Sequence, residues 1–153
     1  MAGAAPSKAM TSAGTSISLC AALPATYDAA GYGALAWVEV GEVSDLGEFG
    51  REYNVVKFNP LKTRGTVKRK GSFDEGNVQI QLARVVSDAG QQVAAAALNS
   101  DASHAAKVVL QDGSIFYFTA QVVSFTTNIG SVDQITSGTV KLEIDTQIVS
   151  VTA

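Results

Sequence analysis

The sequence predicts a mainly β protein, an antiparallel β-sandwich or barrel with one α-helix packed on its outside. Several segments alternate apolar and polar residues with the period of two that marks a half-buried strand. Only one segment changes to helical spacing, and strand-like segments precede and follow it. An order of strands, one helix and further strands favours an antiparallel sheet that the helix covers from one side.

The chain has the length of one folded domain, since 153 residues fall within the usual size of a single unit. Residues 1–15 are rich in Ala, Gly and Ser and predict a mobile arm, and residues 16–153 predict the domain. A hydrophobic content of 46% excludes a disordered chain. The charged fraction is 16%, against about 25% in an average domain, so we expect other protein to cover much of the surface.

Four strands are expected before the helix. Weak alternation predicts that the arm ends in a strand over residues 16–22. β-Branched and aromatic residues bounded by glycines predict two more, Trp37–Val43 and Tyr53–Phe58. Clean alternation predicts a fourth over Asn77–Val86, whose apolar residues face one way and whose glutamines face the other.

The helix is expected over Ser87–Asn99. Asp88 followed three residues later by Gln91 resembles a capping box, and Asn99 is a natural stop. The run Ala94–Ala97 lets such a helix lie very close to a sheet.

Three strands are expected after the helix. Ala106–Gln111 and Ser114–Val123 flank Asp112-Gly113, which is a strong hairpin turn. Gly138–Val149 is the most regular alternation in the chain. From these patterns we expect four residues in the core: Phe118, Val140, Leu142 and Ile144.

Neither a membrane span nor a secretory signal is expected. No apolar run approaches the 18 or so residues that cross a bilayer. A single Lys8 precedes a short and interrupted apolar run, which is a poor match to a signal peptide. The only cysteine, Cys20, cannot form an internal disulfide, which favours folding in a reducing compartment.

Residues for catalysis or metal binding are scarce. Cys20 and His104 are the only residues of their types, and an ordinary zinc site needs four such ligands. Gly31–Ala36 fits the GxGxxA pattern but leads into a strand instead of opening a helix, so its glycines more plausibly serve a tight turn. Asp74-Glu75-Gly76 lacks the spacing of a calcium loop. We therefore expect no catalytic residue, no metal site and no cofactor.

Charge is unevenly distributed, although the net charge is only −3. Six of the 11 bases fall within residues 57–70, where there is no acid, and the site candidates among them are Lys62, Arg64, Lys68, Arg69 and Lys70. An acidic stretch precedes them, with Glu39, Glu42, Asp45 and Glu48. Three interpretations stay open: a solvated hairpin loop, a loop that docks on an acidic patch of a neighbouring copy, and a phosphate-binding segment. Docking is preferred, with the solvated loop close behind. Phosphate binding is the least favoured, because the run lacks the interleaved aromatic residues that stack on bases.

Four segments, together with the long final strand, carry a resemblance to a known family. They are ATYDAAGYGALAWVEVGEVSDLGEFG (Ala25–Gly50), KRKGSFDEGNVQIQLA (Lys68–Ala83), DAGQQVAAAALN (Asp88–Asn99) and KVVLQDGSIFYFTAQVVSF (Lys107–Phe125). In this order and spacing they resemble the tail tube (major tail) proteins of siphoviruses, the long-tailed bacteriophages with flexible, non-contractile tails. The resemblance covers about residues 20–150.

The resemblance implies a structural virion protein and not an enzyme. Six subunits would form a ring, and rings would stack into a tail tube through which DNA passes. Its implied partners are further copies of itself, a tape-measure protein, the tail terminator and distal tail proteins, and DNA in the lumen without sequence specificity, but no membrane. Assembly would take place in the cytoplasm of the host bacterium. A long loop, here at about residues 47–71, would become ordered when rings stack.

A DNA-conducting wall should be polar and poor in bases, because each neutralised phosphate adds affinity. The candidates for such a lumen face are Gln79, Gln81, Glu143, Asp145 and Gln147. Exposure to outside solvent explains the same residues nearly as well. Two other functions stay open: a contractile-tail or type VI secretion tube protein, which has the same architecture, and a β-barrel that binds a small ligand.

Overall fold

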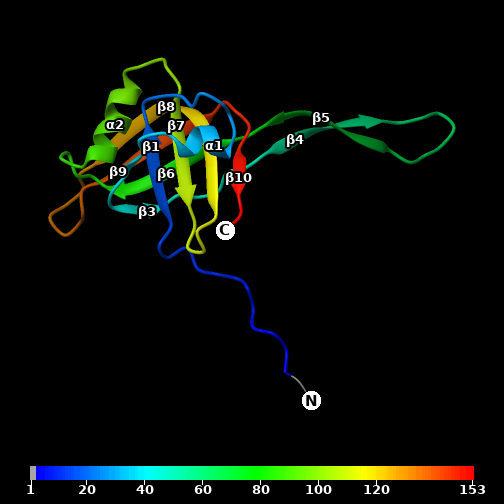
Figure 1. Ribbon diagram of the computed structural model, residues 1–153. Helices are drawn as coiled ribbons and strands as arrows, with labels where there is room; N and C mark the ends of the chain where they lie inside the picture. Colours follow the sequence, from blue (N-terminus) through cyan, green and yellow to red (C-terminus); the bar gives the residue numbers. More distant parts are fainter. Residues whose placement is uncertain (1–2) are drawn as a thin grey trace.

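The computed structural model describes residues 3–153 and contains two antiparallel sheets and two helices (Figure 1). The main sheet has eight strands in the order β2-β1-β7-β8-β9-β6-β3, with β10 paired to β8, and β4 and β5 form a separate hairpin. The elements are β1 (Ser16–Cys20), α1 (Ala29–Gly33), β2 (Val38–Glu39), β3 (Val43–Asp45), β4 (Glu52–Phe58), β5 (Val67–Asp74), β6 (Asn77–Ala83), α2 (Ala89–Leu98), β7 (His104–Val109), β8 (Ile115–Asn128), β9 (Ser137–Ile144) and β10 (Val149–Val151).

The main sheet curls into a half-barrel. β2 and β3 stand at opposite ends of the strand order, yet only residues 40–42 separate them in the chain. The backbone N–H of Val40 donates to Ile17 O of β1 (2.9 Å), and the N–H of Ala83 at the end of β6 donates to Glu42 O (2.9 Å). The two edges of the sheet must therefore approach each other. The mainly β, antiparallel fold class expected from the sequence is confirmed.

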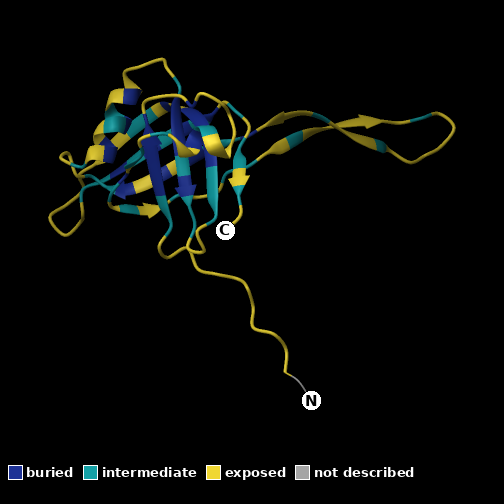
Figure 2. Ribbon diagram, viewed as in Figure 1, coloured by how far each residue is buried: buried dark blue, intermediate teal, exposed yellow. Residues whose placement is uncertain are grey.

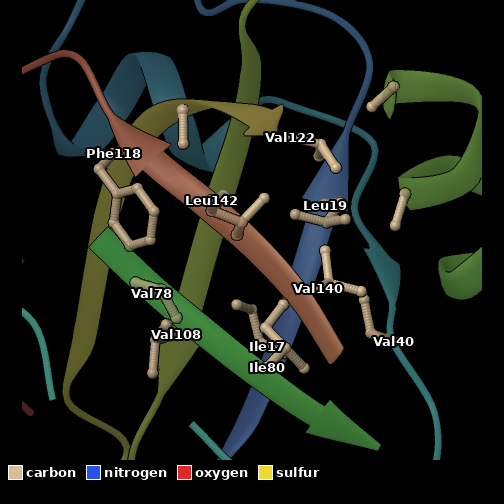
Figure 3. Packing of buried hydrophobic residues seen from close by; sticks show 14 of the residues in the cluster. Ile17, Leu19, Val40, Val78, Ile80, Val108, Phe118, Val122, Val140 and Leu142 are labelled. Atoms are coloured by element: carbon tan, nitrogen blue, oxygen red, sulfur yellow. The ribbon is translucent and has the colours of Figure 1, made fainter. Parts of the chain in front are cut away.

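The core fills the inside of this curl (Figure 3). Its buried members come from five strands, from α2 and from Val40. The largest fully buried ones in this cluster are Ile17, Leu19, Val78, Ile80, Leu82, Val108, Phe118, Val140 and Leu142. The burial of Phe118, Val140, Leu142 and Ile144 agrees with the strand faces expected from alternation.

Helix α2 packs on the sheet through its smallest residues. Ala94 and Ala97 are buried in the core, and Asp88 caps the helix by accepting from Gln91 N (3.0 Å), as the sequence predicts. A Cβ on Gly90 would lie only 2.2 Å from Glu39 O, so the helix approaches β2 as closely as the backbone allows.

Gln91 links α2 to the place where the chain crosses between the sheet edges. The side chain is fully buried, and its Nε2 donates to Gly41 O (3.2 Å) and to Ala83 O (2.9 Å). Its Oε1 accepts from Val85 N (2.9 Å). The capping residue Asp88 accepts from Gly41 N as well (3.1 Å). Two side chains of one helical turn thus hold the crossing against the end of β6.

The expectation of a single helix is corrected by α1. This five-residue helix begins at Asp28, which accepts from Gly31 N (2.8 Å), so the glycines near Tyr32 lie in a helix and not in a tight turn. Tyr32 is buried and its ring stacks on Tyr117 (5.2 Å between centres). A second core forms there, on the sheet face opposite the first. One turn of helix is too short to show a period, which is why the pattern missed it.

Three strand expectations also need correction. Trp37–Val43 is two short strands, because Glu42 has a positive φ of 59° between them. Gly138–Val149 is interrupted after Ile144, where the chain turns back so that β10 pairs with β8. The long loop expected over residues 47–71 is mostly the paired strands β4 and β5.

We predict that Gln91→Ala lowers the free energy of unfolding by roughly 3 kcal/mol or more. The change leaves the backbone groups of Gly41, Ala83 and Val85 without their side-chain partner, and each buried unsatisfied group costs about 1–3 kcal/mol. Urea unfolding followed by tryptophan fluorescence measures the loss. Gln92→Ala, on the exposed side of the same helix, is the matched control and should change stability by less than about 1 kcal/mol.

Candidate functional site

The most prominent feature of the surface is the β4–β5 hairpin, which extends away from the half-barrel (Figure 1). Within residues 3–153 neither of its strands pairs with the main sheet. Nearly all of its residues are exposed on both sides (Figure 2). A two-stranded hairpin is at best marginally stable in water unless something packs against it. Its length and exposure therefore indicate a partner.

The register divides the hairpin into two faces. Lys57 lies opposite Lys68, and Val55 lies opposite Lys70, so these residues share one face. Like charges directly opposite one another destabilise a sheet, which leaves this face suited to an acidic partner. The other face carries Val56 opposite Arg69 and Phe58 opposite Val67.

Large apolar side chains are exposed along the hairpin and at its tip. The exposed fraction is 55% for Val56 and 64% for Phe58, and Leu61 at the tip is fully exposed. Grouped exposed apolar residues on a soluble surface usually mark a binding site. In the sequence, the bases of this segment stand out and its apolar residues do not, because nothing local predicts β5 or assigns the two faces.

The hairpin and the rest of the chain carry net charges of opposite sign. Residues 52–74 carry six bases and two acids, a net charge of +4, whereas the rest of the chain carries five bases and twelve acids, a net charge of −7. The basic β4–β5 hairpin thus projects from an acidic body. Such a distribution favours contact between the hairpin of one copy and the body of another.

A cluster at the base of the hairpin joins its two strands where they leave the body. Arg51 Nε donates to Glu75 Oε1 (2.8 Å), Nη2 donates to the same oxygen, and Nη1 donates to Tyr53 Oη (3.1 Å). The guanidinium also lies over the ring of Phe73, 4.0 Å from its centre. Hydrogen bonds with Tyr53 and Glu75 raise the pKa of Arg51 above its ordinary value. Glu75 is buried, whereas Arg51 stays in contact with solvent.

Glycines flank this cluster on both connections to the body. Gly47 and Gly50 precede β4 with φ of 64° and 144°, and Gly76 follows β5 with φ of 85°. Other residues rarely adopt these values. The hairpin therefore leaves the body through backbone conformations that favour glycine, and the Arg51–Glu75 pair joins its two connections. These two residues lie 24 positions apart, so no local pattern could have indicated their contact.

The acidic and basic candidates do not meet within one chain. Glu39, Glu42, Asp45 and Glu48 are all exposed on the stretch that runs from β2 through β3. The only ion pairs among residues 3–153 are Arg51–Glu75 and Lys141–Glu143, and neither joins the two candidate sets. Both candidate sets are therefore free of ion pairs with each other among the residues that the structure describes.

The structure divides the candidate lumen residues into two groups. Gln79 and Gln81 project outward from β6, and Glu143 projects from the neighbouring β9, where it pairs with Lys141 (3.4 Å). Asp145 and Gln147 lie beyond the end of β9. The carboxylate of Asp145 accepts from Thr119 Oγ1 (2.5 Å) and from Ser103 Oγ, so it holds a loop in place.

The described residues contain no cluster of three or more His, Cys, Asp or Glu side chains that could hold a metal ion. Cys20 is buried in the second core and His104 is buried at the start of β7. The sequence places His104 in a polar loop and predicts a surface position for it, and this prediction is wrong. Between residues 3 and 153 no helix is long and apolar enough to cross a membrane.

The fold occurs in solved structures of large assemblies. A chain of the anti-feeding prophage baseplate, determined by cryo-EM with six-fold symmetrisation, matches with a TM-score of 0.70 at 9% identity, over 95% of this chain and 97% of that one. A chain of the PVC sheath/tube terminator of an extracellular contractile injection system, in its extended state, matches with a TM-score of 0.68 at 11% identity, over 97% and 100%. No protein-family model and no curated protein matches the sequence. At these identities the likeness establishes the fold.

We predict that Glu75→Gln loosens the hairpin without unfolding the body. The substitution keeps the shape of the side chain but removes the charge that Arg51 binds. Amide hydrogen exchange in β4 and β5 should accelerate by roughly five- to tenfold, as expected when charge-assisted hydrogen bonds are weakened. The core strands should keep their protection.

Glu143→Gln is the matched control, because it removes the exposed ion pair with Lys141. Exposed pairs contribute little, so hydrogen exchange should be unchanged throughout that variant. Equal exchange in the hairpins of Glu75→Gln and the unmodified protein would show that the pair does not hold the hairpin.

Proposed function

We propose that this chain is a structural subunit of a contractile, phage-tail-like injection particle, in which it forms rings that stack into a tube. The observation that carries the proposal is the basic, partly apolar hairpin that projects from an acidic body of this fold. The two similar chains described above come from a prophage baseplate and from a contractile injection system. They favour a contractile particle over the flexible phage tail that the sequence resemblance implies.

Self-association follows from the position of the complementary surfaces. The hairpin and the acidic stretch are different surfaces, so a contact between them is heterologous and repeats from copy to copy. Such contacts close into a ring or continue as a filament, and a tube of stacked rings uses both. We propose a ring of six, in line with the symmetry of the similar baseplate.

The ring-stacking role belongs to the basic residues of the hairpin in this proposal. Lys68 and Lys70 lie with Lys57 on its charged face, and Lys62 and Arg64 lie near its tip. The acids Glu39, Glu42, Asp45 and Glu48 are their proposed partners on the neighbouring copy. Low overall charge suits a subunit whose sides are covered by its neighbours.

The wall of the proposed lumen is the outer face of β6 and β9. Gln79 and Gln81 are uncharged, and Glu143 is balanced by Lys141, so this face would bind a passing polymer weakly. Asp145 and Gln147 are less suited to it, since they lie on the turn after β9. The remaining partners in the proposal are a tape-measure protein, the terminator and distal proteins of the particle, and DNA or another cargo.

The tail tube of a non-contractile phage is the second candidate. It is favoured by the order of segments that resembles those proteins, from Ala25–Gly50 to the final strand. The two candidates differ in what covers the outside of the tube, because only a contractile particle has a sheath. Binding of the assembled tube to a sheath protein encoded beside it would distinguish them.

We predict that the purified protein assembles without a cofactor. Concentrated samples should contain rings or tubes of a single diameter, because every copy carries both the basic hairpin and the acidic body. Light scattering gives the mass in solution, and negative-stain microscopy gives the form. A monomer that persists at all salt and protein concentrations contradicts the proposal.

We also predict that reversing Lys68, Arg69 and Lys70 to Glu together blocks tube growth and leaves the fold intact. The three side chains are exposed, so their charges contribute little to stability. A hairpin whose charge is reversed would instead be repelled by the acidic body of the neighbouring copy. Circular dichroism checks the fold, and sedimentation measures assembly. The charge-preserving variant Lys68→Arg, Arg69→Lys and Lys70→Arg should assemble normally. Normal tubes from the reversed variant would mean that the hairpin has another role.

A further inference from the structure

We infer that a partly apolar groove beside the base of the hairpin binds the hairpin tip of a second copy. This inference rests on the proposed self-assembly and names the surface that the hairpin tip occupies. The groove has a volume of about 430 Å³ and lies between β3 with the segment that follows it and the end of β7. Its apolar lining consists of Val43, Leu46, Phe49, Val108 and Leu110.

The lining is attached to the main core. Val43, Leu46, Phe49 and Leu110 are half-buried and pack on buried core residues, and the ring of Phe49 contacts those of Phe116 and Phe118 (5.7 and 5.8 Å between centres). The residues that line the groove are therefore held in place by the core. A preformed apolar depression binds a bulky side chain without first having to order itself.

The groove and the hairpin tip have complementary chemistry. Half of the residues that line the groove are apolar, and the others are Ser12, Thr15, Ser44, Asp45 and Gly47. Glu42 and Glu48 are exposed on the same stretch of chain as Asp45. The tip offers exposed Leu61 and Phe58 with Lys62 and Arg64 beside them. One surface is apolar with acids and the other is apolar with bases. Apolar contact supplies affinity in such a pair, and the charges supply orientation.

A hairpin tip in the groove must belong to another copy, because the chain's own tip cannot reach the groove. Leu46, Gly47 and Phe49 line the groove immediately before β4 begins, so the groove lies at the base of its own hairpin. β4 has seven residues, which place the tip roughly 24 Å from that base. The Arg51–Glu75 pair and the paired strands keep the hairpin extended.

The N-terminal arm is the competing occupant. Ser12 and Thr15 line the groove, and the exposed residues before them leave from the same place. The arm carries a single base, Lys8, and its apolar residues from position 3 to 11 are alanines, Pro6 and Met10. It therefore lacks the bulky aliphatic and aromatic pair and the cluster of bases that the hairpin tip presents.

Disulfide cross-linking between copies tests the inference. In the full-length protein with Leu61→Cys and Leu46→Cys, oxidation after assembly should produce covalent oligomers on a non-reducing gel, and dilute unassembled protein should not. Cys20 is buried and stays in place. The control pair Val132→Cys and Leu46→Cys has an equally exposed aliphatic position elsewhere on the surface, and it should give no ladder. The pair Met10→Cys and Leu46→Cys tests whether the N-terminal arm occupies the groove instead.

The outcomes separate this inference from the proposed function. Absence of any assembly by the unmodified protein overturns the proposed function. Normal assembly without a ladder from the first pair, or with a disulfide formed only in the Met10 pair, within a chain or between chains, overturns the inference and leaves the proposed function standing. A ladder from the first pair alone supports both.

Further variants test the apolar part and the charged part of the contact separately. Leu61→Asp should raise the protein concentration needed for assembly at least tenfold, whereas Val132→Asp should leave it unchanged, since both side chains are fully exposed and only one is assigned to the groove. Lys62→Glu should impair assembly, and combining it with Glu48→Lys should restore part of the loss. Equal effects of the Leu61 and Val132 variants would overturn the inference.

Discussion

The hydrogen bonds of Gln91 at the crossing between the sheet edges are the constraint on which the rest of this structure depends. A sheet whose end strands are joined by residues 40–42 can exist only if it curls, and the crossing exposes backbone groups that no strand satisfies. Gln91 and Asp88 supply their partners from one turn of α2. The helix, the crossing and the end of β6 are thus joined at one point, and the apolar faces of the strands are brought together around one core.

The closed body explains why the hairpin stands apart. Once the crossing and β6 are held, residues 46–76 between them have no place in the curled sheet, so they form a sheet of their own outside it. An isolated hairpin with exposed valines and a phenylalanine would be an aggregation hazard in a protein that acts alone. It is consistent with a protein that completes its surface by assembly, with bases on the hairpin and acids on the body controlling the partner.

Identities of 9% and 11% to chains of the same fold show how little of the sequence this architecture requires. The alternation of buried and exposed residues, a helix with a small-residue face and a close crossing are conditions on residue type and spacing, and many sequences meet them. Function depends on the surface instead, and the hairpin and the acidic stretch are the surface features of this chain that support the proposed tube subunit.

The sequence by itself determined the elements whose information is local. Alternation placed β6, β8 and β9 and their buried faces, the Asp88–Gln91 pair placed the start of α2, and Asp112-Gly113 placed the β7–β8 turn. Only the tertiary structure decided what depends on distant residues. The curl of the sheet, the second core around Tyr32, the Arg51–Glu75 pair and the two faces of the hairpin each join segments that are remote in the chain or too short for a period. Local patterns report which side of an element is apolar, but only packing decides what that side meets.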